Sequence, residues 1–132
     1  THLVVDLAAS FTAASGATLN PMVAGRISDS RTAGTALAAG ETFELPLVGG
    51  GLAPADTVAA ALNVTVTDAT DAGYLTVHPC GQDRPEASNV NFAAGTWIAN
   101  HVTASVGDGA VCFSTSASIH LVVDVAGTYH AD

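Results

Sequence analysis

The stretch Leu62-Asn63-Val64-Thr65-Val66-Thr67 alternates apolar and polar side chains, and Tyr74-Leu75-Thr76-Val77-His78 follows it after a polar, glycine-ended segment over 68–73. A period of two is typical of β-strands that bury one face. We expect these two strands to form a hairpin, with Leu62, Val64 and Val66 on the buried face and the threonines on the other. The most regular part of the chain therefore predicts a β protein.

Further strands are expected on both sides of this pair. In the run 41–48, Phe43, Leu45 and Leu47 share one face, and Pro46 favours a sheet edge because proline donates no ladder hydrogen bond. Residues 28–34 are expected to form a turn or loop, and short extended runs are expected at 2–8, 22–27, 89–92, 97–106, 110–114 and 118–129. About eight strands with almost no helix predict an antiparallel β-sandwich, either jelly-roll or Ig-like.

A repeat connects the two ends of the chain. His2-Leu3-Val4-Val5-Asp6-Leu7 returns 118 residues later as His120-Leu121-Val122-Val123-Asp124-Val125, with Phe11 and Tyr129 at the same offset. Such a recurrence indicates tandem units. We assign 1–13 as the equivalent of the last strand of a preceding repeat, 14–21 as a linker, and 22–132 as one sandwich unit. Residues 2–8 are therefore expected to pair outside the 22–129 core or to lie between chains.

The composition limits the partners of the chain. Twelve acidic residues against three basic ones give a formal charge of −9, which argues against nucleic acid or an anionic membrane as partner. No apolar run is long enough to span a membrane, and no signal peptide is recognisable. The scarcity of lysine and the abundance of threonine, serine, alanine and glycine favour a secreted protein.

Two cysteines, Cys80 and Cys112, lie in or beside predicted strands. No CxxC pair or close Cys/His cluster accompanies them, so we expect a disulfide rather than a metal site. A disulfide implies an oxidising compartment. The alternative is two buried thiols in the core.

Five segments in order carry a resemblance to a known family. They are Arg26-Ile27-Ser28-Asp29-Ser30-Arg31, Ala61-Leu62-Asn63-Val64-Thr65, Gly73-Tyr74-Leu75-Thr76-Val77-His78-Pro79-Cys80-Gly81, Arg84-Pro85-Glu86-Ala87-Ser88-Asn89-Val90-Asn91-Phe92, and Leu121-Val122-Val123-Asp124-Val125-Ala126-Gly127-Thr128-Tyr129. This pattern resembles a repeat of secreted and cell-wall-associated actinobacterial proteins. The resemblance implies an accessory domain that occurs in tandem or beside wall hydrolases, and His78 and Thr128 depart from the family pattern.

The polar residues of these segments are the candidate ligand-binding set: Arg26, Asp29, Arg31, Arg84, Asn89, Asn91 and Trp97. Guanidinium groups bind carboxylates in a bidentate manner, and amides bind sugar hydroxyls. The alternative is structural: arginines that fix loops through ion pairs and amides that bridge strands. Trp97 would stack on a sugar ring if exposed, but a buried position as the core anchor is favoured. We expect Asp124 to contact Arg26 or Arg31.

No motif predicts a cofactor, a metal site or catalysis. Calcium is the weak alternative, through the turn residues Asp68, Asp71 and Asp108, but no D-x-D-x-D-G loop occurs. The five histidines are scattered singly, and there is no G-x-S-x-G segment. The chain is therefore not expected to be an enzyme.

The sequence as a whole predicts a secreted, non-catalytic adhesion or binding module of the cell surface or cell wall. Polysaccharide is the leading ligand class, and neighbouring repeats or copies of the chain are further partners. A structural spacer in a tandem array or a self-assembling surface protein is the alternative, and an accessory domain of a wall hydrolase is the third reading. A binding module should carry Trp97, Tyr74 or clustered Asn and Arg on an exposed concave patch, whereas a spacer should bury them.

Overall fold

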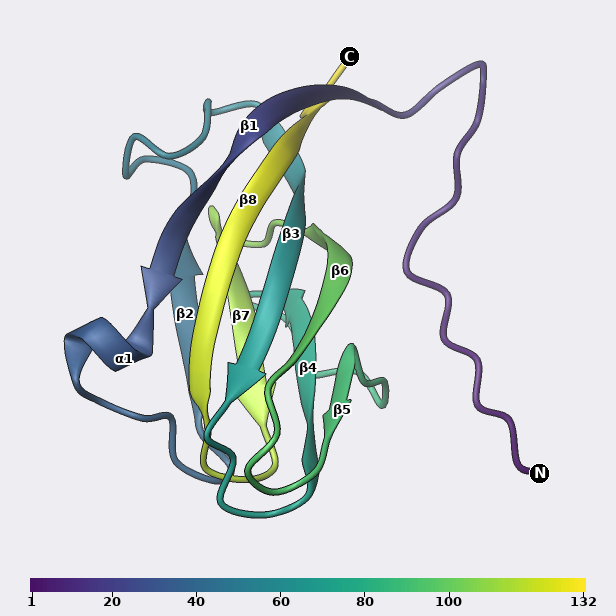
Figure 1. Cartoon of the computed structure of the whole chain (residues 1–132). Helices are drawn as coiled ribbons and strands as arrows, with labels where there is room; N and C mark the ends of the chain where they lie inside the picture. Colours follow the sequence, from purple (N-terminus) through teal and green to yellow (C-terminus); the bar gives the residue numbers. More distant parts are fainter.

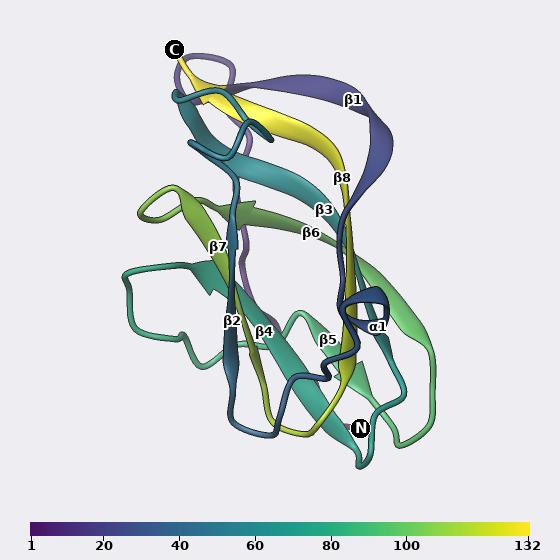
Figure 2. The same cartoon turned by 90° about the vertical axis from the view of Figure 1, so that its left-hand side faces the viewer.

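The computed structural model describes all 132 residues and contains eight strands and one helical turn. The elements are β1 (Ala17–Asp29), α1 (Ser30–Ala33), β2 (Thr42–Pro46), β3 (Thr57–Thr67), β4 (Gly73–Pro79), β5 (Val90–Phe92), β6 (Ile98–Ser105), β7 (Ala110–Thr115) and β8 (His120–Ala131). Two antiparallel sheets of four strands, in the orders β1-β8-β3-β6 and β2-β7-β4-β5, pack face to face (Figures 1 and 2). The predicted all-β sandwich is confirmed.

The connectivity distinguishes between the two expected sandwich types. Consecutive strands alternate between the sheets, with β4 and β5 as the one pair of neighbours in sequence that share a sheet. In an immunoglobulin fold the first two strands lie in the same sheet, whereas β1 and β2 here lie in different sheets. The order is that of a jelly roll.

The expected hairpin between 62–67 and 74–78 is wrong. β3 pairs with β6 and β8, while β4 pairs with β5 and β7 in the opposite sheet. The segment between them crosses the sandwich because its backbone bonds neighbouring loops: Thr70 N–H donates to the Ser118 carbonyl, and the Ala69 carbonyl accepts from Gly95. The predicted inward faces are correct, since both strands direct their apolar side chains into the shared core.

The core lies between the two sheets and is a single cluster of 21 buried apolar residues. Leu62, Val64 and Val66 from β3 meet Leu75 of β4 and Phe113 of β7 there, and all five are fully buried. The predicted inward face of the run 41–48 is also confirmed, because Leu45 and Leu47 are buried and Phe43 packs against the cluster. β2 is an edge strand, as Pro46 predicted.

β1 begins earlier than the sequence predicted. The strand starts at Ala17, so residues 17–21 of the expected 14–21 linker are paired with β8, from Ala17 opposite Ala131 to Pro21 opposite Gly127. Small and polar residues suggested a linker, but the edge of a sheet accepts them because an edge strand need not bury both faces. The expected loop at 28–34 contains one helical turn, with Asp29 as N-cap and Gly34 in the left-handed region as C-cap.

The N-terminal segment stands apart from the sandwich. Residues 1–12 belong to no strand, and the segment runs alongside the β5 and β6 side of the molecule (Figure 1). Residues 2–8 are therefore not paired within the core, and their expected pairing outside it or between chains stays a prediction. The structure contains no helix that is long and apolar enough to cross a membrane.

Candidate functional site

The arginines near β1 form an ion-pair network. The Asp29 carboxylate accepts from Arg31 Nε at 2.9 Å and Nη2 at 2.7 Å, and lies 3.3 Å from Arg26 Nη1. Arg26 Nε donates to Asp124 Oδ1 at 2.9 Å, which confirms the expected contact between Asp124 and an arginine. The network joins the end of β1, the helical turn and β8, so its first role is structural.

The electrostatics of this network favour the charged forms of Arg26, Asp29 and Arg31. The bond from Arg31 holds the pKa of the Asp29 carboxyl well below its usual range, and the same bond raises the pKa of Arg31. The bond to Asp124 raises the pKa of Arg26. Because each guanidinium already has a carboxylate, an acidic ligand would have to displace Asp29 or Asp124. Arg26, Asp29 and Arg31 are therefore weak candidates for ligand binding.

Trp97 does not anchor the core. Its side chain is 64% exposed, so the favoured expectation of burial is wrong. Trp97 lies in the loop just before the edge strand β6, and Phe113 fills the core instead. The Arg31 guanidinium carbon lies 5.1 Å from the centroid of the indole ring, a cation–π contact.

Asn89 has a structural role. Its Oδ1 accepts from Val77 N–H at 2.7 Å, its own N–H donates to the Leu75 carbonyl at 2.8 Å, and its carbonyl accepts from Asn100 Nδ2 at 2.8 Å. These bonds fix the end of the loop 80–89 against β4. At the other end of that loop, Cys80 is disulfide-bonded to Cys112 of β7, as the sequence predicted.

The remaining predicted residues, Arg84 and Asn91, come together with Tyr74. Tyr74 of β4 lies directly opposite Asn91 of β5 in the sheet register. Because Leu75 points into the core, its neighbour Tyr74 points to the outer face of the sheet. A hollow of about 420 Å³ forms there, which we call the Tyr74 groove; its lining includes Tyr74, Arg84, Glu86, Ser88 and Asn91, with Val4 and Asp6 of the N-terminal segment at its border.

The Tyr74 groove has a rigid base. The loop that carries Arg84 and Ser88 is held at Cys80 by the disulfide and at Ala87, whose carbonyl accepts from the Thr76 hydroxyl at 2.6 Å. The Tyr74 N–H donates to Ser116 Oγ at 2.8 Å, which fixes the start of β4. The backbone around the groove is thus fixed by the fold at the start of β4 and at both ends of the loop.

Arg84 differs from the other two arginines, because it is the one arginine without an ion-pair partner. It is exposed beside the groove, where it is available to a hydroxyl or a carboxylate of a ligand. Tyr74 is outside the predicted ligand set, although the sequence named it among the residues that a binding module would expose. The signal that finds it is its register opposite Asn91, which requires knowledge of the strand pairing.

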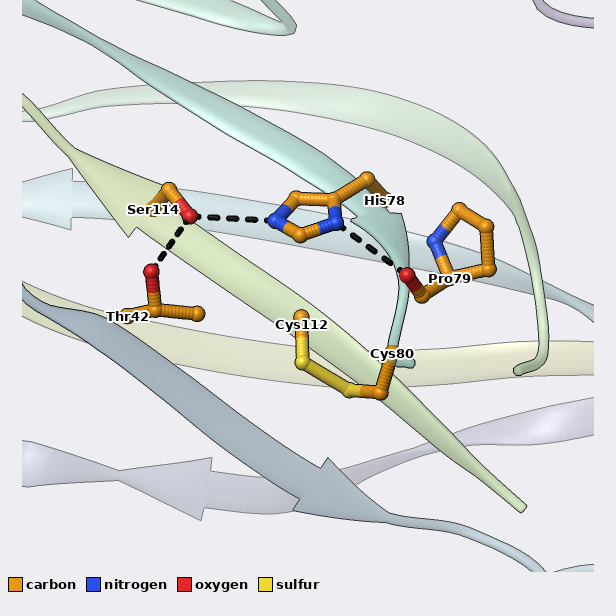
Figure 3. The surroundings of a disulfide bond; sticks show 6 residues. All are labelled: Thr42, His78, Pro79, Cys80, Cys112 and Ser114. Atoms are coloured by element: carbon orange, nitrogen blue, oxygen red, sulfur yellow. Dashed lines mark hydrogen bonds between the residues drawn. A yellow bond between two sulfur atoms is a disulfide. The ribbon is translucent and has the colours of Figure 1, made fainter. Parts of the chain in front are cut away.

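A second polar row crosses the same sheet beside the disulfide (Figure 3). The Ser114 hydroxyl lies 3.0 Å from His78 Nε2 and 2.7 Å from Thr42 Oγ1, and His78 Nδ1 lies 3.1 Å from the Pro79 carbonyl oxygen. A Ser-His contact is one element of nucleophilic catalysis. Here the serine and histidine are buried and their bonds connect β2, β7 and β4, so the row acts as a cross-strand network.

One group of potential metal ligands lies close together: Glu44, Cys80 and Cys112. The two sulfurs are joined in the disulfide, so neither is a thiolate able to bind zinc. The turn residues Asp68, Asp71 and Asp108, the weak alternative for calcium, do not belong to this group.

No protein-family model matches the chain, and neither a curated protein nor a solved structure is similar enough to it to count as a match. The resemblance to the actinobacterial repeat therefore stays an expectation, and the site has to be interpreted from its own geometry.

Proposed function

We propose that this chain is a non-catalytic extracellular module that binds polysaccharide in the Tyr74 groove. One observation carries the proposal: the exposed Tyr74 ring and the Asn91 amide, on β4 and β5, line one groove with the Ser88 hydroxyl and the Arg84 guanidinium. Ser88 and Arg84 lie on the loop that the disulfide holds at Cys80. Aromatic rings stack on the apolar faces of sugars, and the amide and guanidinium provide the hydrogen bonds that orient the hydroxyls. The exposed Tyr74 beside clustered Asn and Arg supports the binding module over the spacer.

Two further features, the disulfide and the net charge, support the proposed compartment and the proposed class of ligand. The Cys80–Cys112 bond persists in oxidising compartments, which favours secretion to the cell surface or wall. A formal charge of −9 disfavours anionic partners, but it leaves neutral polysaccharides unaffected. Arg84 adds a single local cation that would tolerate one acidic sugar in the groove.

The test is binding of a neutral glucan and of a uronic-acid-containing polysaccharide, measured by affinity electrophoresis and calorimetry. Tyr74→Ala should weaken binding about tenfold, equal to about 1.4 kcal/mol. Trp97→Ala is the matched control, because it also removes an exposed aromatic ring but lies outside the groove. Arg84→Gln should weaken binding of the acidic polysaccharide more than that of the neutral one.

Two results would contradict the proposal. Equal losses in Tyr74→Ala and Trp97→Ala would place the binding surface elsewhere. No binding of either polysaccharide by the unmodified chain would favour the second candidate, a structural spacer in a tandem array.

One observation favours that candidate: β1 starts beside the end of β8, with Thr18 Oγ1 donating to Asp132 at 2.7 Å. Successive units could therefore be joined through a short connection.

A further inference from the structure

The four edge strands of the sandwich differ in how well they resist pairing with another chain. β1 contains Pro21 and two register shifts, β2 ends at Pro46, and β5 has three residues. β6 has eight residues, pairs with β3 without a register shift, and contains no proline, lysine or acidic residue. Proteins normally protect edges by short length, proline, charge, bulges or a covering loop. β6 is the least protected edge of this molecule, although its Asn100 side chain donates to the Asn89 carbonyl of the loop 80–89.

The N-terminal segment His2–Ala8 has the sequence of a strand but is not part of a sheet. Its copy in β8 buries the alternate residues Leu121, Val123 and Val125 in the core. The corresponding Leu3, Val5 and Leu7 are between 78% and 88% exposed. The segment therefore presents an apolar strand face that has no partner in its own domain.

The segment and the β6 edge lie on the same side of the molecule. Asp6, Leu7 and Ala8 border a hollow of about 420 Å³ whose other side includes residues 100–105 of β6. Residues farther along the segment, such as Thr12, approach Thr103 and Ser105, so the segment runs in the same direction as β6 (Figure 1). Every strand pairing in both sheets is antiparallel. The segment of the same chain thus approaches the edge in the less favourable orientation.

We propose that His2–Ala8 of one molecule adds to the β6 edge of a second copy as an antiparallel fifth strand. Exchange in both directions gives a two-fold symmetric dimer, in which each chain both donates and accepts a strand. With the alternation seen in β8, Leu3, Val5 and Leu7 face the core side, where the partly exposed Ile98 of β6 lies. Asp6 then lies on the outer face, the same face as the exposed His101.

The test uses the full chain and compares two exposed valines. Val5→Asp places a charge on the inward face of the added strand. Val23→Asp is the control, because Val23 is 95% exposed and lies between the paired positions Pro21 and Gly25 of β1. Sedimentation velocity at about 0.15 M salt should show a concentration-dependent dimer for the unmodified chain and for Val23→Asp. The dissociation constant of the Val5→Asp dimer should be at least about tenfold larger than that of the unmodified dimer.

Hydrogen exchange of the β6 amides provides the second measurement. Alternate amides of residues 98–105 already bond β3, so only the others, which face the free edge, report on an added strand. These edge amides should exchange slowly in the unmodified chain and quickly in Val5→Asp. A chain that is monomeric at all concentrations overturns the proposal, whether or not these amides are protected. Protection in a monomer would mean that the segment pairs with its own β6. A dimer that Val5→Asp and Val23→Asp weaken equally would also overturn it, because the exposed valine of the segment would then have no special role.

Discussion

Removal of the Cys80–Cys112 disulfide should lower the free energy of unfolding by about 3.7 kcal/mol. The bond closes a loop with a sequence separation of 32 residues, and the chain-entropy relation gives this value at 25 °C. The effect comes mainly from the unfolded state, which gains conformational freedom when the link is absent. The folded sandwich keeps its strand pairing, because β4 and β7 are also joined by a regular ladder from Leu75 to Pro79.

Urea unfolding followed by circular dichroism measures this loss. Three samples are compared: the oxidised chain, the reduced chain, and Cys80→Ala/Cys112→Ala. The reduced chain and the double variant should both show a lower midpoint and a steeper dependence of the free energy on urea, because the unlinked chain exposes more surface. A loss below about 1 kcal/mol in both samples would refute the loop-entropy reasoning. A loss in the double variant alone would point to packing around the alanines.

Three further changes test other parts of the fold. Thr57→Val should stabilise the chain by about 1 kcal/mol in urea unfolding, because the Thr57 hydroxyl is buried without a hydrogen-bond partner, whereas Thr57→Ser should not. Asp29→Asn should make stability depend less on pH in the acid range. The pKa of Asp29 is lower in the folded state than its unfolded value of about 3.9. The ionised carboxylate therefore stabilises the fold above about pH 3.9, and this contribution is lost as the pH falls below that value. Equal urea midpoint shifts from pH 7 to pH 3 in both proteins would contradict this. Trp97→Ala should change the free energy of unfolding by less than about 0.5 kcal/mol, because the Trp97 ring is 64% exposed. For the same reason, the emission wavelength of this sole tryptophan in the unmodified chain should shift little on unfolding.

Sequence alternation predicted which residues face inward but not which strands pair. Leu62, Val64 and Val66 were correctly placed on a buried face, because a period of two identifies a face in any sheet. The same pattern fits a hairpin within one sheet and a connection between two sheets. The bonds that decide between them join residues far apart in sequence, such as Thr70 and Ser118, and no local pattern contains that information.

The candidate site was predictable in part for the same reason. The disulfide and the contact between Arg26 and Asp124 follow from scarce residue types in suitable strands. Arg84 could be named as a candidate, but nothing local separates it from the paired arginines. The Tyr74 groove depends on the β4–β5 register and on a loop folded over the outer face, which are both products of the tertiary structure.

The repeat and the strand order together limit how such units could follow one another. In this domain the start of β1 and the end of β8 lie side by side, since Ala17 pairs with Ala131. If 2–13 is the counterpart of 120–131, only residues 14–16 separate a preceding β8 from this β1. Three residues span at most about 10 Å, so successive units would meet at their corresponding ends rather than stack head to tail. A tandem array built this way would place the start of each β4, which carries Tyr74, away from the shared junction, because β4 begins at the end of the sandwich opposite the start of β1 and the end of β8 (Figure 1). The spacer and binding proposals are therefore compatible, because under both an array of this geometry would present several grooves to one polysaccharide and would gain affinity through multivalency.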